Sequence, residues 1–203
     1  LKINPDGLYV DATFGGGGHS REILSRLKSG RLIAFDQDDD ARLEAEKIEN
    51  RSFTFCQANF KYLKRYLKLH GVTKVDGVLA DLGISSHQID VPERGFSTRY
   101  TGPLDMRMNQ QAELTAQKVV NTYSESQLHK VLGMYGELKN AKRAAAAIVQ
   151  HRTQQSLTQT DHLVEALKFV TPRGKENKYL AQVFQALRIE VNQEMEALSE
   201  FLI

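Results

Sequence analysis

The sequence lacks several features that would place it in a specialised class of protein. It has a single cysteine, Cys56, so it forms no internal disulfide, which is typical of proteins in the reducing cytoplasm. No apolar run approaches the roughly 20 residues needed to cross a bilayer, and no charged and apolar leader opens the sequence. We therefore expect a cytoplasmic protein with no membrane-spanning segment and no signal for secretion.

The sequence also lacks a metal-ligand pattern and a strong net charge. Its six histidines never pair with one another or with Cys56 at ligand spacing, so no metal site is expected. The net charge is only +2, but it is uneven: residues 103–178 carry 11 Lys/Arg and 7 Asp/Glu, a net charge of +4, and the rest carries −2. This asymmetry allows a polyanionic partner such as RNA without requiring one.

The most informative feature that is present is a run of four glycines at 15–18. Glycine lets the backbone turn with positive φ and lie against a ligand. The next strand-like run ends in Asp36, 21 positions after Gly15. Glycine-rich turns without a ligand are common, but an acid about 20 residues later is typical of a nucleotide-type site, in which it binds ribose hydroxyls. The acids at 38–40 are interpreted as the first turn of the next helix.

Strand-like and helix-like patterns alternate in the first half of the chain. Strands are predicted at residues 8–12, 31–36, 52–56 and 75–81, and helices at 20–27, 39–49 and 60–70. Such alternation indicates a parallel sheet with helices on both faces. Because ligands of these sheets bind at the carboxyl ends of the strands, we expect four loops to converge there: 15–18, 36, 57–60 and 81–85.

After about residue 102 the pattern is helical throughout. Ser124 and Gln127 form a capping box, and further helices are predicted at 140–152, at 160–170 and, as one long helix, from about 179 to 202. We therefore predict two domains: a cofactor-binding domain of residues 1–102 and 179–203, and an all-helical insertion of residues 103–178. A doubly wound sheet normally has further strands after such a helix, so the sheet is expected to be incomplete in this chain.

Two classes of cofactor fit the first two loops. A dinucleotide site has the pattern Gly-x-Gly-x-x-Gly/Ala, and counting from Gly15 its last position is Ser20, which disfavours NAD. The fourth strand ends in Asp81, beside the reactive end of the cofactor. Hydride transfer is typically served by a Tyr–Lys or His–Asp pair, and none is evident, whereas methyl transfer to an amine can use a strand-end acceptor. A methyltransferase and a nicotinamide-dependent oxidoreductase both remain open on this basis.

Six segments are specific enough to indicate a family. They are 11–20 (DATFGGGGHS), 81–86 (DLGISS), 93–97 (ERGFS), 102–108 (GPLDMRM), 135–137 (YGE) and 184–189 (FQALRI). Together they resemble the bacterial RsmH (MraW) family, which transfers a methyl group from S-adenosylmethionine to N4 of a cytidine in small-subunit (16S) ribosomal RNA. The resemblance implies an α/β fold, a Rossmann-like class I methyltransferase sheet with an inserted all-helical domain. It also implies that the family's opening segment and the C-terminal strands of the sheet are absent from this chain.

Carried over position by position, the resemblance implies a set of cofactor contacts: Gly17, Gly18, His19, Asp36, Phe60, Asp81 and Gln88. The two glycines would let the backbone approach the methionine part, Asp36 would bind the ribose, and Phe60 would lie against the adenine. Asp81 is also the predicted catalytic residue, as the acceptor for N–H bonds of the cytosine amine. From the residues alone, Phe60 equally fits a core aromatic, His19 an exposed helix start, and Asp81 a helix cap or surface ion pair.

The expected partner is small-subunit ribosomal RNA, either free or in an assembled small subunit. A single-stranded or loop cytosine is favoured, because the base must leave its stack to react. The helical insertion is the expected recognition element, and its candidate phosphate contacts, each with a solvated charged face as the alternative, are Lys139, Lys142, Arg143 and Arg152, with Arg94 and Arg107 nearer the pocket. A homodimer and a non-catalytic ribosome-binding module remain open.

Overall fold

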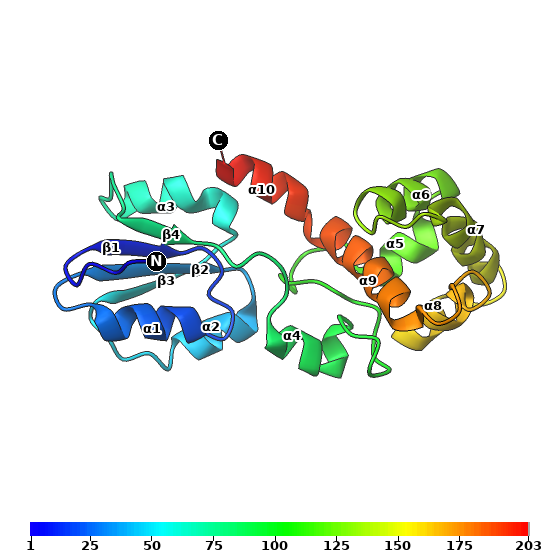
Figure 1. Ribbon diagram of the computed structural model, residues 1–203, viewed down its shortest axis with the longest axis horizontal. Helices are drawn as coiled ribbons and strands as arrows, with labels where there is room; N and C mark the ends of the chain where they lie inside the picture. The colour runs from blue at the N-terminus through cyan, green and yellow to red at the C-terminus, as the bar shows by residue number, and fades with distance from the viewer. Residues whose placement is uncertain (203) are drawn as a thin grey trace. The chain divides into compact units, whose positions relative to one another are not determined.

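The computed structural model describes residues 1–202, which fold as two compact units (Figure 1). One unit contains Leu1–His87 and the residues from Met195 onward, and the other contains Gln88–Glu194. The units divide the chain at 87/88 and 194/195, whereas the predicted domains divide it at 102/103 and 178/179. No helix among residues 1–202 is long and apolar enough to cross a membrane.

The first unit is built on a four-stranded parallel sheet in the order β3-β2-β1-β4. The strands are β1 (Leu8–Asp11), β2 (Arg31–Asp36), β3 (Phe53–Gln57) and β4 (Gly77–Leu79). Tyr9 of β1 lies beside Leu32 on one side and Gly77 on the other. Because β2 and β3 extend from one edge of β1 and β4 from the other, the topological switch point lies between β1 and β4. Open α/β sheets bind their ligands outside the carboxyl ends of the strands at such a point.

Helices cover both faces of this sheet, as the strand patterns predict. In β2, Ile33 and Phe35 point to the side of α3 (Leu63–Leu69), and Leu32 and Ala34 point to the opposite side. That opposite side is covered by α1 (Gly18–Arg26) and α2 (Asp39–Ala45), as Figure 1 shows. All four of these β2 side chains are fully buried. β2 is therefore a continuous apolar run whose side chains point alternately to the two covered faces, as expected for a strand packed on both sides.

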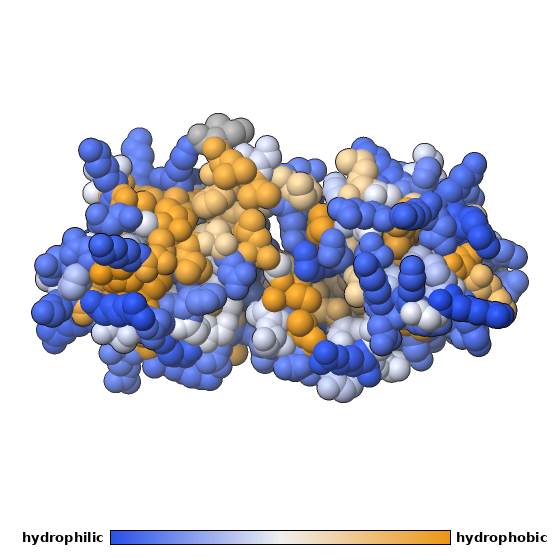
Figure 2. Space-filling model, viewed as in Figure 1, coloured by the Kyte–Doolittle hydropathy of each residue, from blue (hydrophilic) through white to orange (hydrophobic). Residues whose placement is uncertain are grey.

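Apolar residues are exposed in and near β4, at one edge of the sheet. Among residues 1–202, β4 pairs with β1 alone, and its middle residue, Val78, is 39% exposed. Leu69 of α3 and Leu202, in the last helix α10 (Glu194–Leu202), are each 74% exposed. Figure 2 shows apolar surface gathered over the α3 and β4 region. β4 is also shorter than the strand predicted at 75–81.

The prediction of one long helix from about 179 to 202 is wrong, because this segment forms two helices. α9 (Glu176–Asn192) and α10 (Glu194–Leu202) are separated by Gln193, which has a left-handed φ of 49°. The side chain of Asn192 accepts a hydrogen bond from the backbone N–H of Met108 at 2.7 Å and donates one to the carbonyl of Met106 at 2.8 Å. The apolar stripe continues through the break, so its periodicity alone could not show that the helix ends.

The second unit is helical, as predicted. It contains the 3₁₀ turn η2 (Pro92–Arg94) and the helices α5 (Ala116–Thr122), α6 (Glu125–Met134), α7 (Ala141–Arg152), α8 (Thr160–Leu167) and α9, and α4 (Ser86–Asp90) spans the boundary between the units. The capping box is confirmed: the Ser124 hydroxyl accepts from the Gln127 N–H, and the Gln127 side chain accepts from the Ser124 N–H. α6 packs against α7 and α9, and α7 against α8. The short helices α4 and α5 were not foreseen.

The single cysteine is expected to react slowly in the folded protein. Cys56 is buried in the cluster formed by Val10 and Ile33, and burial raises the pKa of its thiol from 9.0 to about 11. The reactive thiolate is therefore about 100-fold rarer at about pH 8 than in an unfolded chain. A disulfide reagent followed by absorbance, with and without urea, measures this difference. Equal rates in the two conditions would contradict the buried position.

Candidate active site

Four loops meet at the carboxyl edge of the sheet, and hydrogen bonds tie them together. The backbone N–H of Gly15, after β1, donates to Oδ2 of Asp36, at the end of β2, at 2.8 Å. The N–H of Asp81, after β4, donates to Oγ1 of Thr13 at 2.7 Å. The loop after β3 joins through Asn59, whose side chain donates to the Gln37 amide oxygen at 3.1 Å. The convergence predicted from the strand ends is therefore present in the structure.

The glycine run contains positions that the backbone requires and positions that leave open space. Gly17 has φ +76°, and a Cβ there would lie 2.6 Å from Cζ of Phe14, so no larger residue fits without a shift. Gly15 also has positive φ, at +53°. In contrast, a Cβ at Gly16 or Gly18 would meet no heavy atom within 4 Å. Gly18 is the first residue of α1, so the helix starts beside space that a ligand can enter.

A buried carboxylate that the sequence did not single out holds the base of this loop. Asp11 is fully buried at the end of β1, where its Oδ2 accepts from the Ser20 hydroxyl at 2.7 Å and its Oδ1 accepts from the Thr13 N–H at 3.1 Å. Burial raises the pKa of Asp11, and these hydrogen bonds oppose the rise. Its position at the end of a strand, four residues before the first glycine of the run, was the available signal. Asp11 is a positioning residue, since it fixes both sides of the loop.

Asp36 combines structural hydrogen bonds with remaining capacity to accept more. Its Oδ2 accepts from Gly15 and its Oδ1 accepts from the Asp38 N–H at 3.0 Å. The Gln37 backbone N–H also acts on this carboxylate, and because its two oxygens have about four lone pairs between them, it can still accept from a hydroxyl group of a ligand. Burial raises the pKa of Asp36, and the backbone hydrogen bonds lower it. Asp38 caps α2 by accepting from the Asp40 N–H, which confirms the interpretation of the acids that begin this helix.

Asp81 lies exposed in the loop after β4. Its backbone, not its side chain, makes the bond to Thr13 that holds the loop. Two positions further on, Gly83 has φ +140° and open space where a Cβ would stand. Asp81 is close enough to Asp11 to raise the pKa of that buried carboxyl. A carboxylate thus stands free at the switch point between β1 and β4.

The other three predicted cofactor contacts differ in burial and in the unit to which they belong. Phe60 begins the 3₁₀ turn η1 (Phe60–Tyr62) and is partly buried, with its ring edge-to-face against Phe201 at 5.4 Å between centroids. His19 is exposed in the first turn of α1. Gln88 is buried in α4 and belongs to the second unit. The structure therefore gathers the glycines, Asp36, Phe60 and Asp81 at one edge of the sheet, and Gln88 is not part of that unit.

The comparison with known families bears on this arrangement directly. The model of the MraW methylase family matches residues 1–203. This chain belongs to the MraW methylase family. The parallel sheet with helices on both faces is thus a Rossmann-like methyltransferase fold, as predicted.

Curated relatives of this MraW methylase match along its whole length. A protein of Cytophaga hutchinsonii named ribosomal RNA small subunit methyltransferase H is 60% identical over 202 residues, which cover 100% of this chain and 68% of that protein. Proteins of the same name from Flavobacterium johnsoniae and Bacteroides thetaiotaomicron are 56% and 55% identical, covering 100% of this chain and 67% and 66% of those proteins. The chain spans about two thirds of the length of these relatives.

In the helical unit of this MraW methylase, two arginines predicted to meet phosphates are bound by the chain itself. Arg107 donates to both carboxylate oxygens of Asp105, at 2.9 and 2.7 Å, and also to the carbonyls of Gln110 and Ala112. Arg94 is 6% exposed and donates to the Arg107 carbonyl at 2.9 Å. Their guanidinium groups hold the segment before α5, which corrects the prediction for both residues.

Arg152 also has a structural role within the chain, and that role predicts a loss of stability on truncation. Its Nη1 donates to the carbonyls of Val120 and Tyr123 at 2.8 and 2.7 Å, which satisfies the end of α5. We expect Arg152→Ala to lower the free energy of unfolding by about 2 kcal/mol, because two carbonyls lose a charged donor. Urea unfolding measures the change, with the exposed Lys130→Ala as control, expected within about 0.5 kcal/mol of the parent. Equal losses in the two variants would contradict the role.

Proposed function

We propose that this protein transfers a methyl group from S-adenosylmethionine to N4 of a cytidine in small-subunit ribosomal RNA. The family supports methyl transfer, and the names of the relatives support a ribosomal RNA substrate. The observation that carries the proposal is a glycine loop with open space at Gly18, which hydrogen bonds join to the strand-end residues Asp36 (to Gly15) and Asp81 (to Thr13). We also propose a cytoplasmic location, where such a substrate is found.

The residues at the sheet edge fit the proposed methyl donor. The backbone at Gly17 and Gly18 can approach its methionine part, since a Cβ at Gly18 meets only open space. Asp36 can still accept from a ribose hydroxyl, and the partly buried ring of Phe60 offers an apolar surface to the adenine. His19, Asp81 and Gln88 complete the proposed set of contacts. When bound, S-adenosylmethionine supplies an electrophilic methyl group.

The dinucleotide alternative is disfavoured by the residue at its last motif position. Ser20 stands where that site has glycine or alanine, and the structure buries Ser20 with its hydroxyl bonded to Asp11. This side chain is therefore used to fix the loop. A dinucleotide site instead has a residue without a polar side chain at this position.

Asp81 is the proposed catalytic residue, and its task follows from the chemistry of the amine. The lone pair of the cytosine amino group is delocalised into the ring, so the nitrogen is a poor nucleophile while it stays planar. A carboxylate that accepts its N–H bonds favours a pyramidal nitrogen and then takes up the positive charge and the proton. The exposed Asp81 carboxylate is suited to this role, and the carbonyls of Leu82 and Gly83 are proposed to assist.

Methyl-labelled cofactor provides the test of this function. The full-length protein is incubated with labelled S-adenosylmethionine and with either free small-subunit RNA or assembled small subunits, and RNA-bound label is counted. We expect label in the RNA of one of the two substrates. Binding of subunits without transfer of label would instead indicate a non-catalytic ribosome-binding module, and calorimetric binding of NAD in place of S-adenosylmethionine would indicate an oxidoreductase.

A further inference from the structure

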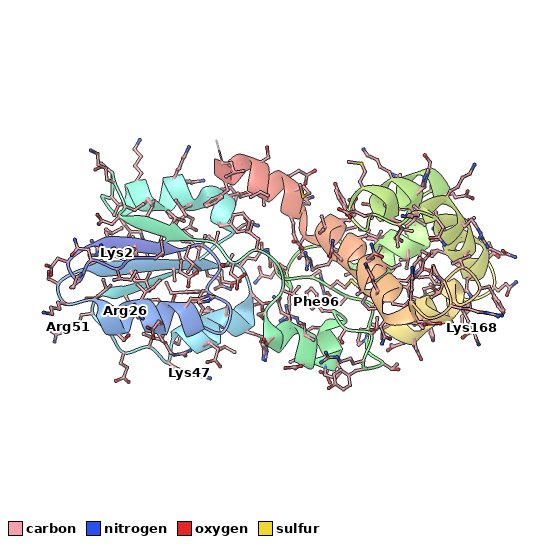
Figure 3. All side chains as sticks on the ribbon, viewed as in Figure 1. Lys2, Arg26, Lys47, Arg51, Phe96 and Lys168 are labelled. Atoms are coloured by element: carbon pink, nitrogen blue, oxygen red, sulfur yellow. The ribbon has the colours of Figure 1, made fainter. Side chains whose placement is uncertain are left out.

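The helical unit carries a fully accessible aromatic ring. Phe169 is 89% exposed, the highest value among the large hydrophobic side chains of residues 1–202. It lies directly after α8, next to Lys168, which Figure 3 labels at the end of that helix. A phenylalanine with this exposure has a ring surface available for stacking.

The segment that carries this ring lies at the end of the unit where α7 and α9 begin. The Asn140 side chain, just before α7, donates to the carbonyl of Val170 at 2.8 Å, which joins the start of α7 to the segment that carries Phe169. Tyr179, in the first turns of α9, is buried. Burial raises the pKa of the Tyr179 hydroxyl, and Asn140 and Arg143 at the start of α7 oppose the rise, so α9 also begins at this end of the unit. Neither α7 nor α9 has a side-chain cap at its N-terminus, and both helix dipoles add positive potential there.

The segments around Phe169 and the starts of α7 and α9 carry mostly positive charge. Residues 137–143 and 165–178 together carry 7 Lys/Arg and 3 Asp/Glu, a net charge of +4, which equals the whole excess of residues 103–178. Two of the acids are already engaged: Glu165 pairs with Lys168 at 3.2 Å, and Glu176 accepts from the Gly174 N–H at 2.8 Å. Within the described chain, six exposed cations here have no ion-pair partner: Lys139, Lys142, Arg143, Arg173, Lys175 and Lys178.

We propose that Phe169 and these six cations form a stacking surface for single-stranded or looped ribosomal RNA. The ring stacks on an unpaired base, and the surrounding ammonium and guanidinium groups bind the flanking phosphates, which is how proteins hold single strands. The surface lies outside the proposed methyl-transfer residues, so it holds RNA without taking part in the reaction. The inference rests on the proposed function for its RNA partner.

The test compares RNA binding by Phe169 variants of the full-length protein. Fluorescence anisotropy with a labelled single-stranded oligoribonucleotide is expected to show an affinity about 5- to 50-fold lower for Phe169→Ala and near the parent value for Phe169→Trp, because stacking needs a ring. Met134→Ala is the matched control, since Met134 is also an exposed apolar side chain, at 60%, on another helix. A Phe169→Ala affinity within about twofold of the parent overturns the proposal.

The cations are tested through the salt dependence of the same binding. Replacing Lys142, Arg143 and Lys175 together with alanine is expected to reduce the slope of log affinity against log salt by about 2, at roughly 0.7 per lost phosphate contact on a single strand. An unchanged slope overturns the phosphate contacts. Impaired binding of assembled subunits, with unchanged affinity for RNA, also overturns the proposal and assigns the surface to a ribosomal protein.

The two proposals fail in distinguishable ways. If the parent protein labels ribosomal RNA but Phe169→Ala changes neither RNA affinity nor the KM for RNA, the stacking surface is wrong and the function stands. If no label is transferred but Phe169→Ala weakens RNA binding as expected, the function is wrong and the surface stands. A raised KM at unchanged kcat in Phe169→Ala supports both.

Discussion

Asp81→Ala is expected to lower kcat at least about 100-fold, the usual contribution of a positioned acceptor for a proton. The affinity for S-adenosylmethionine should fall much less than kcat, because the main role proposed for this side chain, accepting from the amine, is exerted in the transition state. The variant should fold, since the loop is held by the Asp81 backbone N–H on Thr13 and the side chain is exposed. Turnover with ribosomal RNA and calorimetric titration of the cofactor measure the two quantities.

Asp81→Asn is the matched control for this prediction. Asparagine keeps one acceptor oxygen but loses the charge, so it should retain more turnover than alanine and less than the parent. An unchanged kcat in Asp81→Ala at saturating cofactor would remove Asp81 from the reaction. A cofactor Kd raised more than about tenfold with kcat unchanged would assign the carboxylate to binding alone.

Two neighbouring glycines are expected to respond to alanine in opposite ways. Gly17→Ala should lower the free energy of unfolding by about 2–3 kcal/mol, because Gly17 has φ +76° and the new Cβ would lie 2.6 Å from Cζ of Phe14. Gly18→Ala should keep stability or raise it by about 0.5–1 kcal/mol, since Gly18 is the first residue of α1 and its Cβ would enter open space. Urea unfolding of the two variants measures these changes.

The same Gly18 variant separates a folding role from a binding role. If the open space is occupied by S-adenosylmethionine, the new methyl group should weaken its binding about 10- to 100-fold despite unimpaired folding. Gly16→Ala is the matched control, because its Cβ also meets nothing within 4 Å and Gly16 is not among the proposed contacts. Full cofactor affinity in Gly18→Ala would show that the donor does not use this space.

Features that depend on local chemistry were predictable from the sequence. The glycine run and Asp36 each follow or end a predicted strand, so the sequence predicted that they meet at the carboxyl edge of the sheet. The hydrogen bond from Gly15 to Asp36 shows that they do. The capping box at Ser124 and Gln127 needs only residues three apart, and it is confirmed. The buried strands also follow from apolar runs, since both faces of β2 are covered.

Features that depend on distant partners were not predictable. Gln193 breaks a continuous apolar stripe, and the segment at Met106 and Met108 that fixes Asn192 lies more than 80 positions earlier. Arg152 looks like any surface cation until the carbonyls at the end of α5 are placed beside it. Asp11 reads as the end of a strand, and its role needs the position of Ser20. Spacing along the chain does not contain this information.

The atom that receives the methyl group tests the central claim most directly. The full-length protein labels small-subunit RNA with methyl-labelled S-adenosylmethionine, and the RNA is digested to nucleosides that are separated and weighed by mass spectrometry. Because Asp81 is proposed to accept from the exocyclic amine of a cytosine, we expect the label on N4 of a single cytidine. Label on a ring carbon or on a ribose 2′-hydroxyl would contradict the account.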